Sequence, residues 1–320
     1  MNLRSFEKFN YALRPAKNIE RKMMCEAFGR LSTLASLRRY RYIGLGGLSF
    51  QDFALLHQRL GVHDMTSIEK EEDARERFLH NRPYSCIRVR WGSSSTVLPT
   101  LSWRKRTIVW LDYDYPLDDS VLADVRTVVA HLCSGSVLVT TVEADPKRVK
   151  SARNVAKARL DALRERVGEE KIPRGIRGAD LRAWGLARVC REIIHNEIIE
   201  TLAHRNAPLA GRWRIGYEQL FNFHYADGAQ MVTVGGLFLN GADRARVPTD
   251  HFDDLGFVRS GNDPYHIEVP VLTWRETRYL DARLPGTAAV PHHPSWIPEG
   301  ERRKYASLYR YFPTYLEAEL

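Results

Sequence analysis

Between residues 41 and 144, short apolar segments alternate with helical segments, and this alternation constrains the fold more than any other feature of the sequence. Two of the segments, residues 106–114 (RTIVWLDYD) and 136–144 (SVLVTTVEA), are nearly continuous apolar runs, as is typical of strands that are covered on both faces. Further strand-like segments occupy residues 41–46, 64–70 and 85–92. Strand–helix repeats with short connections predict an α/β fold with a doubly wound, mostly parallel sheet.

The segments outside this alternation predict additions to the sheet. Two aromatic-rich runs joined by Ala226, Asp227 and Gly228 are typical of a β-hairpin, which would close one edge of the sheet and make it mixed. We therefore expect five parts: an N-terminal helical segment (1–37), the core (38–146), a helical cap (147–210), the hairpin (211–242), and a C-terminal extension of loop and helix (243–320).

The lengths of the apolar runs and the spacing of the cysteines indicate the cellular compartment of the protein. No apolar run approaches the roughly 18 residues that span a bilayer, and the first ten residues do not resemble the apolar part of a signal peptide. The four cysteines lie far apart, which is typical of reduced thiols. We expect a cytoplasmic protein without a membrane partner, and the sequence does not indicate an oligomeric state.

Positive charge is concentrated in two zones of the chain. The net charge is +9, and the excess lies mainly in residues 14–41 and 147–191. Basic surfaces attract nucleic acid and other polyanions, although charged helix faces are also often only solvated. Four cations of the first zone fall near one face of the predicted helix 15–37 and suit an anionic substrate equally well: Arg14, Lys17, Arg21 and Lys22.

A glycine cluster follows the first strand, where Gly44, Gly46 and Gly47 occur within four residues. Ser49 and Asp52 then form a capping-box-like start for a helix over residues 49–61. A strand, a glycine turn and a helix amino end together allow the backbone to approach a ligand closely. Glycines at such a turn can equally serve tight packing of the helix on the strand.

A carboxylate at the end of the second strand strengthens the ligand interpretation. Glu69 follows the glycines by roughly twenty residues, which is where a ribose-binding acid belongs in nucleotide-binding folds. Such a carboxylate accepts hydrogen bonds from the two ribose hydroxyls. The alternative is an ordinary solvated residue in front of the charged segment that follows.

The order of these motifs resembles that of the class I S-adenosylmethionine-dependent methyltransferases, which have a Rossmann-like core. YIGLGG (residues 42–47) resembles their glycine motif, SIEK (67–70) their ribose acid, RWGSSS (90–95) the loop that touches adenine, and WLDYDYPL (110–117) the segment beside the transferred methyl group. The resemblance covers residues 38–240. More narrowly, the chain resembles uncharacterised bacterial proteins labelled "putative O-methyltransferase". DYDYP differs from the N/D-P-P-Y of amino methyltransferases, and no acid stands in the first turn.

The resemblance implies S-adenosylmethionine as the cofactor and a role for each motif residue. Gly44, Gly46 and Gly47 would hold the methionine portion, Glu69 the ribose, and Ser93 or Ser94 would approach the adenine. Asp112 or Asp114 would be the base that takes the acceptor's proton, or would hold a divalent metal. Either could instead cap the next helix, for which Asp118 and Asp119 are better placed.

The sequence is compatible with three functions. The first is a methyltransferase that acts on oxygen and selects its acceptor through the cap. The second is a binding or regulatory module of the same fold that acts on nucleic acid or a protein partner through its basic surface. The third is a nicotinamide-dependent oxidoreductase. His195 lies in a largely apolar helix and is expected to be a core or cap histidine. No residue set has the spacing of a strong metal site, so we assign no metal ligands.

Overall fold

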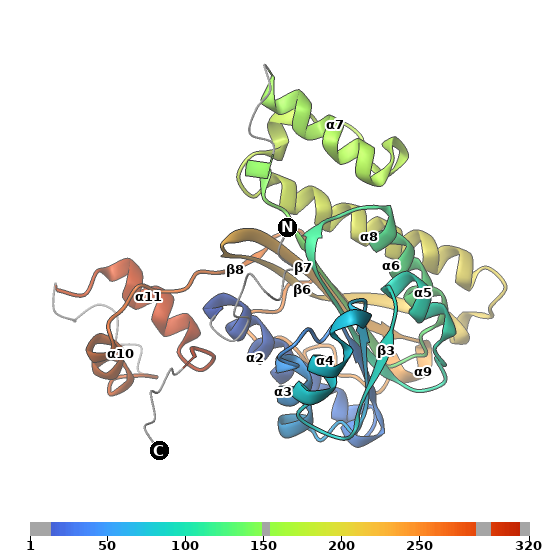
Figure 1. The fold of residues 1–320 in the computed structure, drawn as a ribbon, viewed down its shortest axis with the longest axis horizontal. Helices are drawn as coiled ribbons and strands as arrows, with labels where there is room; N and C mark the ends of the chain where they lie inside the picture. Colours follow the sequence, from blue (N-terminus) through green and yellow to red (C-terminus); the bar gives the residue numbers. More distant parts are fainter. Residues whose placement is uncertain (1–13, 149–153, 286–295, 314–320) are drawn as a thin grey trace.

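The computed structural model describes residues 14–148, 154–285 and 296–313, and it is built on one mixed sheet (Figure 1). The order of its strands is β3-β2-β1-β4-β5-β7-β6-β8. The five strands of the parallel part are β1 (Arg41–Gly44), β2 (Asp64–Glu69), β3 (Ile87–Trp91), β4 (Thr107–Pro116) and β5 (Ser136–Glu143). The predicted α/β class with a mostly parallel sheet is confirmed.

A hairpin closes the sheet beyond β5, as predicted. β7 (Ala229–Leu239) runs antiparallel to β5, and β6 (Gly216–Asp227) runs antiparallel to β7. Gly228 joins the two strands with a φ of +94°, a conformation that favours glycine. A short eighth strand, β8 (Tyr265–Ile267), pairs in parallel with β6. It lies in the predicted C-terminal extension of loop and helix (243–320), for which the sequence predicts no strand, because three residues are too few to show a strand period.

Helices cover both faces of the sheet because strand side chains alternate between two apolar clusters. Tyr42 belongs to the cluster under α2 (Pro15–Gly29), α3 (Gln51–Leu60) and α4 (Arg75–Asn81). Its neighbour Ile43 belongs to the cluster under α6 (Asp119–His131), α7 (Val155–Val167) and α8 (Gly185–Asn206). Asp118 caps α6 by accepting the N–H of Val121 at 3.0 Å, as expected from the sequence. Among the helices of the described segments, none is long and apolar enough to cross a bilayer.

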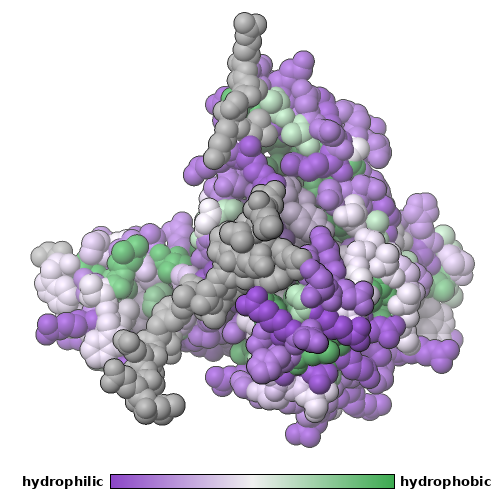
Figure 2. Space-filling view, in the orientation of Figure 1, coloured by the Kyte–Doolittle hydropathy of each residue, from purple (hydrophilic) through white to green (hydrophobic). Residues whose placement is uncertain are grey.

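The C-terminal part carries three short helices. α9 (Gly241–Arg244) lies against β7, whereas α10 (Trp274–Asp281) and α11 (Glu299–Leu308) extend away from this core and lie at the far left of Figure 1. Figure 2 shows apolar side chains on this outlying part. Residues 286–295 and 314–320 of the predicted extension, like residues 1–13 of the predicted N-terminal segment, lie outside the described residues.

The predicted capping box at the start of α3 is wrong. The residue in front of the helix is Phe50, in a left-handed conformation with a φ of +46°, and no side chain caps the helix there. Phe50 is fully buried and packs edge-on against Phe53 and Phe78. Asp52 turns inward, where it accepts the hydroxyl proton of Tyr42. Burial of the Phe50 ring therefore sets the start of this helix. The predicted helix 15–37 also ends early, at Gly29.

The amino end of α2 is held by a residue more than two hundred positions away. Asp227, at the tip of the hairpin, accepts the backbone N–H of Lys17 at 2.8 Å and that of Ala16 at 3.3 Å. Arg14, directly before the helix, provides no side-chain cap. The carboxylate thus satisfies two of the N–H groups that every helix start leaves open, and it docks α2 onto the sheet.

Replacing Asp227 by alanine is expected to lower the free energy of unfolding by about 1 kcal/mol, the usual cost of losing an N-terminal cap. Urea unfolding followed by circular dichroism measures the change. Asp227→Asn is the matched control, because its amide oxygen can still accept an N–H. Equal stability of the alanine variant and the wild type would show that this contact does not hold α2.

Candidate active site

A cavity of about 560 Å³ lies at the carboxyl ends of β1, β2 and β4. The strand order reverses between β1 and β4, and ligands of open α/β sheets bind at this kind of reversal. Seven of the eight residues predicted from the sequence line the cavity: Gly46, Gly47, Glu69, Ser93, Ser94, Asp112 and Asp114. Gly44 is not among the described lining residues. A Cβ at Gly44 would lie 2.7 Å from the Tyr42 hydroxyl oxygen, so this glycine serves packing.

The two remaining glycines differ in what they do. A Cβ at Gly46 would lie 2.6 Å from Ser67 Oγ and 2.9 Å from the Phe50 ring, so only glycine brings the turn this close to β2. The N–H of Gly46 donates to the same Ser67 oxygen at 3.1 Å. Gly47 has a φ of +56°, and nothing in the described structure lies within 4 Å of its Cβ position. The turn is therefore packed on one side and open on the other.

Glu69 lies directly beside this turn. The residue is 6% exposed, the Ser67 hydroxyl donates to its Oε1 at 2.5 Å, and the backbone N–H groups of Gly46 and Gly47 are near enough to its carboxylate to lower its pKa. Burial raises the pKa of Glu69 to about 7, against the opposing effect of these donors. The carboxyl group is thus held in place and can accept hydroxyl hydrogen bonds when ionised. The turn and the acid meet across the ends of β1 and β2.

The serines lie on the third side of the cavity, at the start of α5 (Ser94–Val97). Ser93 Oγ accepts the N–H of Thr96 at 3.2 Å, so this hydroxyl caps the short helix. Ser94 hydrogen-bonds with Tyr113, whose hydroxyl donates to Asp124 at 2.7 Å. Both serines therefore have structural partners as well as a place in the cavity wall.

Asp112 is paired with a lysine of α2, which the sequence did not predict. Lys17 Nζ lies 2.6 Å from Asp112 Oδ1 and 2.7 Å from Glu20 Oε2. The same ammonium group donates to the Tyr225 hydroxyl at 3.1 Å and sits 4.5 Å from the centre of the Trp110 ring. The Lys17 side chain is 5% exposed and that of Glu20 is fully buried. One buried cation therefore joins two carboxylates.

A chain of buried hydrogen bonds connects this ion pair to the floor of the sheet. Trp110 Nε1 donates to Thr141 Oγ1 at 3.0 Å, Thr141 bonds with Thr233 at 2.8 Å, and Thr233 donates to Glu20. Burial raises the pKa of Glu20, while Lys17 opposes the shift. The sequence contains one indication of the Lys17–Glu20 ion pair: the two residues lie three positions apart on one helix, beside its apolar stripe.

The cationic face of α2 contributes to the same cavity. Arg14, Lys17 and Arg21 line it, whereas Lys22 donates to the carbonyl oxygen of Phe312 at 3.3 Å, away from it. Asp114 is exposed at the rim, two residues beyond Asp112 on β4. The cavity therefore combines a carboxylate side (Glu69, Asp112 and Asp114) with a cationic side, an arrangement that suits a polar or anionic ligand.

Other residues weighed from the sequence lie elsewhere. His195 is on α8, on the other face of the sheet, with its ring 5.8 Å from that of Tyr217. Burial lowers the pKa of His195. Across the described segments, no group of three or more His, Cys, Asp or Glu side chains is arranged to hold a metal ion.

The sequence of this chain matches a protein-family model. A family model described as "Putative O-methyltransferase" matches residues 9–320. No curated protein matches the sequence.

Several solved structures align with this chain at low sequence identity. Trm1 from Pyrococcus horikoshii, in complex with S-adenosyl-L-methionine, aligns with 77% of this chain at 10% identity and a TM-score of 0.42. An O-methyltransferase family protein from Burkholderia thailandensis aligns with 69% at 12% identity and a TM-score of 0.34. Cofactor-bound Rv0187 from MTB aligns with 68% at 13% identity and a TM-score of 0.36. The chain spans 61%, 56% and 78% of these three proteins.

Proposed function

The chain belongs to the family described as "Putative O-methyltransferase", and from this membership we propose that it transfers a methyl group from S-adenosylmethionine to an oxygen atom of its acceptor. One observation carries the proposal: the buried Glu69 carboxylate and the Gly46–Gly47 turn meet in one cavity at the reversal point of the sheet. This is where a parallel α/β sheet binds a nucleoside-containing ligand. The cavity, about 560 Å³, is of ordinary ligand-binding size.

The donors and acceptors present fit an adenosine-type cofactor. Glu69 would accept hydrogen bonds from the two ribose hydroxyls, and ionised Glu69 has no proton to offer in return. The open side of Gly47 would receive the methionine portion, and Ser93 and Ser94 form the wall that would approach the adenine. When bound, the cofactor would supply an activated methyl group for the transfer.

The residues at the end of β4 would handle the acceptor. In methyl transfer to a hydroxyl, the oxygen–carbon bond forms as the sulfur–carbon bond breaks, and the hydroxyl proton passes to a base. We assign this proton to Asp112 or Asp114, the two carboxylates on that side of the cavity. The Lys17 ammonium group, 2.6 Å from Asp112, would stabilise negative charge that develops on the acceptor oxygen. Arg14 and Arg21 favour an acceptor that is itself anionic.

A transfer experiment tests the reaction class. The full chain is incubated with S-adenosylmethionine labelled in the methyl group and with fractionated cell extract, and labelled products are identified by mass spectrometry. We expect transfer to an oxygen atom, with no transfer by Glu69→Ala. Label on nitrogen or carbon would overturn the O-directed proposal. No transfer to any fraction, despite binding of S-adenosylhomocysteine, would favour the binding or regulatory module instead.

A further inference from the structure

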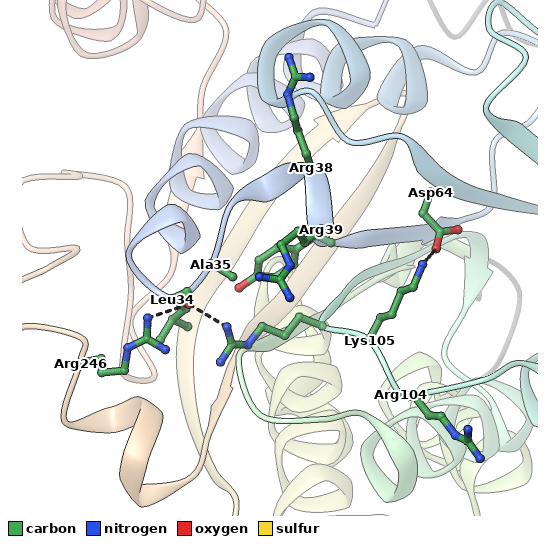
Figure 3. A pocket seen from close by; sticks show the side chains of 10 residues that line it. Leu34, Ala35, Arg38, Arg39, Asp64, Arg104, Lys105 and Arg246 are labelled. Carbon is green, nitrogen blue, oxygen red and sulfur yellow. Dashed lines mark hydrogen bonds and ion pairs between the residues drawn. The ribbon is translucent and has the colours of Figure 1, made fainter.

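A second and larger hollow, about 760 Å³, lies at the amino ends of β1, β2 and β4 (Figure 3). It is therefore on the opposite edge of the sheet from the candidate active site. Six of its described lining residues are cationic: Arg38, Arg39, Arg104, Lys105, Arg106 and Arg246. Asp64 is the only acidic side chain among those ten lining residues. We call these six cations the basic edge.

The floor of the basic edge is built from arginines whose hydrogen bonds are used within the fold. Arg106 donates to both carboxylate oxygens of Asp243, at 2.7 and 2.9 Å, and to the carbonyl of Leu34 at 2.8 Å. Arg246 donates to the same carbonyl at 2.9 Å. Ser134 donates to Asp243 at 2.6 Å, and Arg106 and Ser134 together hold the pKa of this carboxyl below its usual range. The floor is therefore rigid and positively charged.

The rim of the hollow differs from its floor, because the hydrogen-bond donors of the rim arginines are not used within the described part of the fold. Arg38, Arg39 and Arg104 are exposed, and within the described segments none of the three has an ion pair or a side-chain hydrogen bond. Figure 3 shows Arg39 in the middle of the hollow, with Arg38 and Arg104 on opposite sides of it. The guanidinium groups of these three arginines are therefore available to pair with a bound anion.

Positive charge continues from this hollow along the edge of the sheet. Asp64 is shared by three cations: Lys105 at 2.7 Å, Arg41 at 3.4 Å, and Arg88. Arg41 and Arg88 also line an adjoining hollow of about 360 Å³ that contains Arg90. A single phosphate group would occupy only one part of the cationic surface that the two hollows form together. The extent of this surface favours a polymer with repeated negative charges.

We propose that the basic edge and the adjoining hollow bind the phosphodiester backbone of nucleic acid. Arginine is suited to this task because its planar guanidinium group pairs with phosphate through two hydrogen bonds. The aromatic side chain that lines the larger hollow, Tyr40, is fully buried and offers no exposed ring for base stacking. The contacts are thus to the backbone, which positions nucleic acid without reading its sequence.

This site goes beyond the proposed methyltransferase function and does not depend on it. β1 separates the two edges and is four residues long, which is roughly 13 Å of extended chain. Nucleic acid bound at the basic edge leaves the cofactor cavity open. Binding of RNA and binding of S-adenosylhomocysteine are therefore expected to be independent, so either can fail without the other.

The test uses a fluorescein-labelled RNA hairpin, whose fluorescence anisotropy is measured with the full chain over a range of KCl concentrations. The Arg39→Ala/Arg104→Ala double variant is expected to bind about 10-fold more weakly than wild type. The slope of log K against log salt should become less negative by about 2, because two phosphate contacts are lost. The removed side chains are exposed and unpaired, so folding should not change.

The matched control is Lys157→Ala/Arg174→Ala, which removes two exposed cations from the second basic zone, on and near α7. This variant should bind the hairpin like wild type. Equal losses in the two double variants, or no binding by wild type at low salt, would overturn the proposal. Displacement of the hairpin by inorganic pyrophosphate at an equal concentration of phosphate groups would do the same, since it would indicate a small-anion site.

Discussion

Glu69→Ala is expected to weaken the binding of S-adenosylhomocysteine by about 100-fold or more. The proposed site places two ribose hydroxyls on this carboxylate, and a hydrogen bond to a charged group contributes roughly 1.5–3 kcal/mol. Loss of both contacts therefore amounts to at least about 3 kcal/mol, and each 1.4 kcal/mol is a factor of ten in affinity. Isothermal titration calorimetry with wild type and variant measures the difference.

The control for this variant is Glu71→Ala, which removes the same charge from the wall of the same cavity. It should bind the ligand with nearly wild-type affinity, because no ribose contact is assigned to Glu71. If the two variants lose affinity equally, the effect is one of general charge, and Glu69 does not hold the ribose. Unfolding curves of the two variants show whether the fold survives.

The pH profile of binding provides a second signature of Glu69. Burial raises the pKa of its carboxyl to about 7 in the empty protein, and the ribose hydroxyls bind the ionised form. Binding thus requires loss of a proton, so the association constant should rise as the pH increases through about 7 and level off above it. Glu69→Gln cannot ionise, and its residual binding should lack this rise.

Lys17→Met is expected to lower the free energy of unfolding by about 3–5 kcal/mol, the usual cost of removing one partner of a buried ion pair. Lys17 lies 2.7 Å from Glu20, whose side chain is fully buried. Without the ammonium group, Glu20 has no cation to offset its burial, and the charge of Asp112 raises its pKa further. Urea unfolding at neutral pH measures the loss.

The matched variant is Lys17→Met/Glu20→Gln, which removes the stranded charge together with its partner. It should recover most of the lost stability. The loss in Lys17→Met should also shrink as the pH falls from neutral toward about 4.5, the ordinary pKa of a glutamate, and should be smallest below that value, because Glu20 is then protonated in both the folded and the unfolded chain. A Lys17→Met variant as stable as wild type would contradict the assigned role of the pair.

The features of the fold that could be predicted from the sequence are those with local causes. The apolar runs at β4 and β5 predict buried parallel strands, and Gly228 between two alternating runs predicts the hairpin. The start of α3 could not be predicted, because the burial of Phe50 against Phe78 depends on residues far along the chain. The same holds for the cap that Asp227 provides to α2.

The candidate site likewise has features that the sequence predicts and features that it does not predict. The carboxyl ends of neighbouring parallel strands share one edge, so the pattern of strands was enough to place Glu69 beside the glycine turn and Asp112 across from it. The pairing of Lys17 with Asp112 joins residues 95 positions apart. It depends on how α2 docks on the sheet, and no local pattern indicates that docking.

The central claim is that the cavity at the ends of β1, β2 and β4 holds the adenosine part of S-adenosylmethionine. A crystal structure of the full chain grown with S-adenosylhomocysteine tests it most directly. We expect both ribose hydroxyls within hydrogen-bonding distance of the Glu69 carboxylate, and the amino acid portion beside Gly47. Density for the ligand elsewhere, or a ribose that points away from Glu69 while the cavity is occupied, would contradict the account.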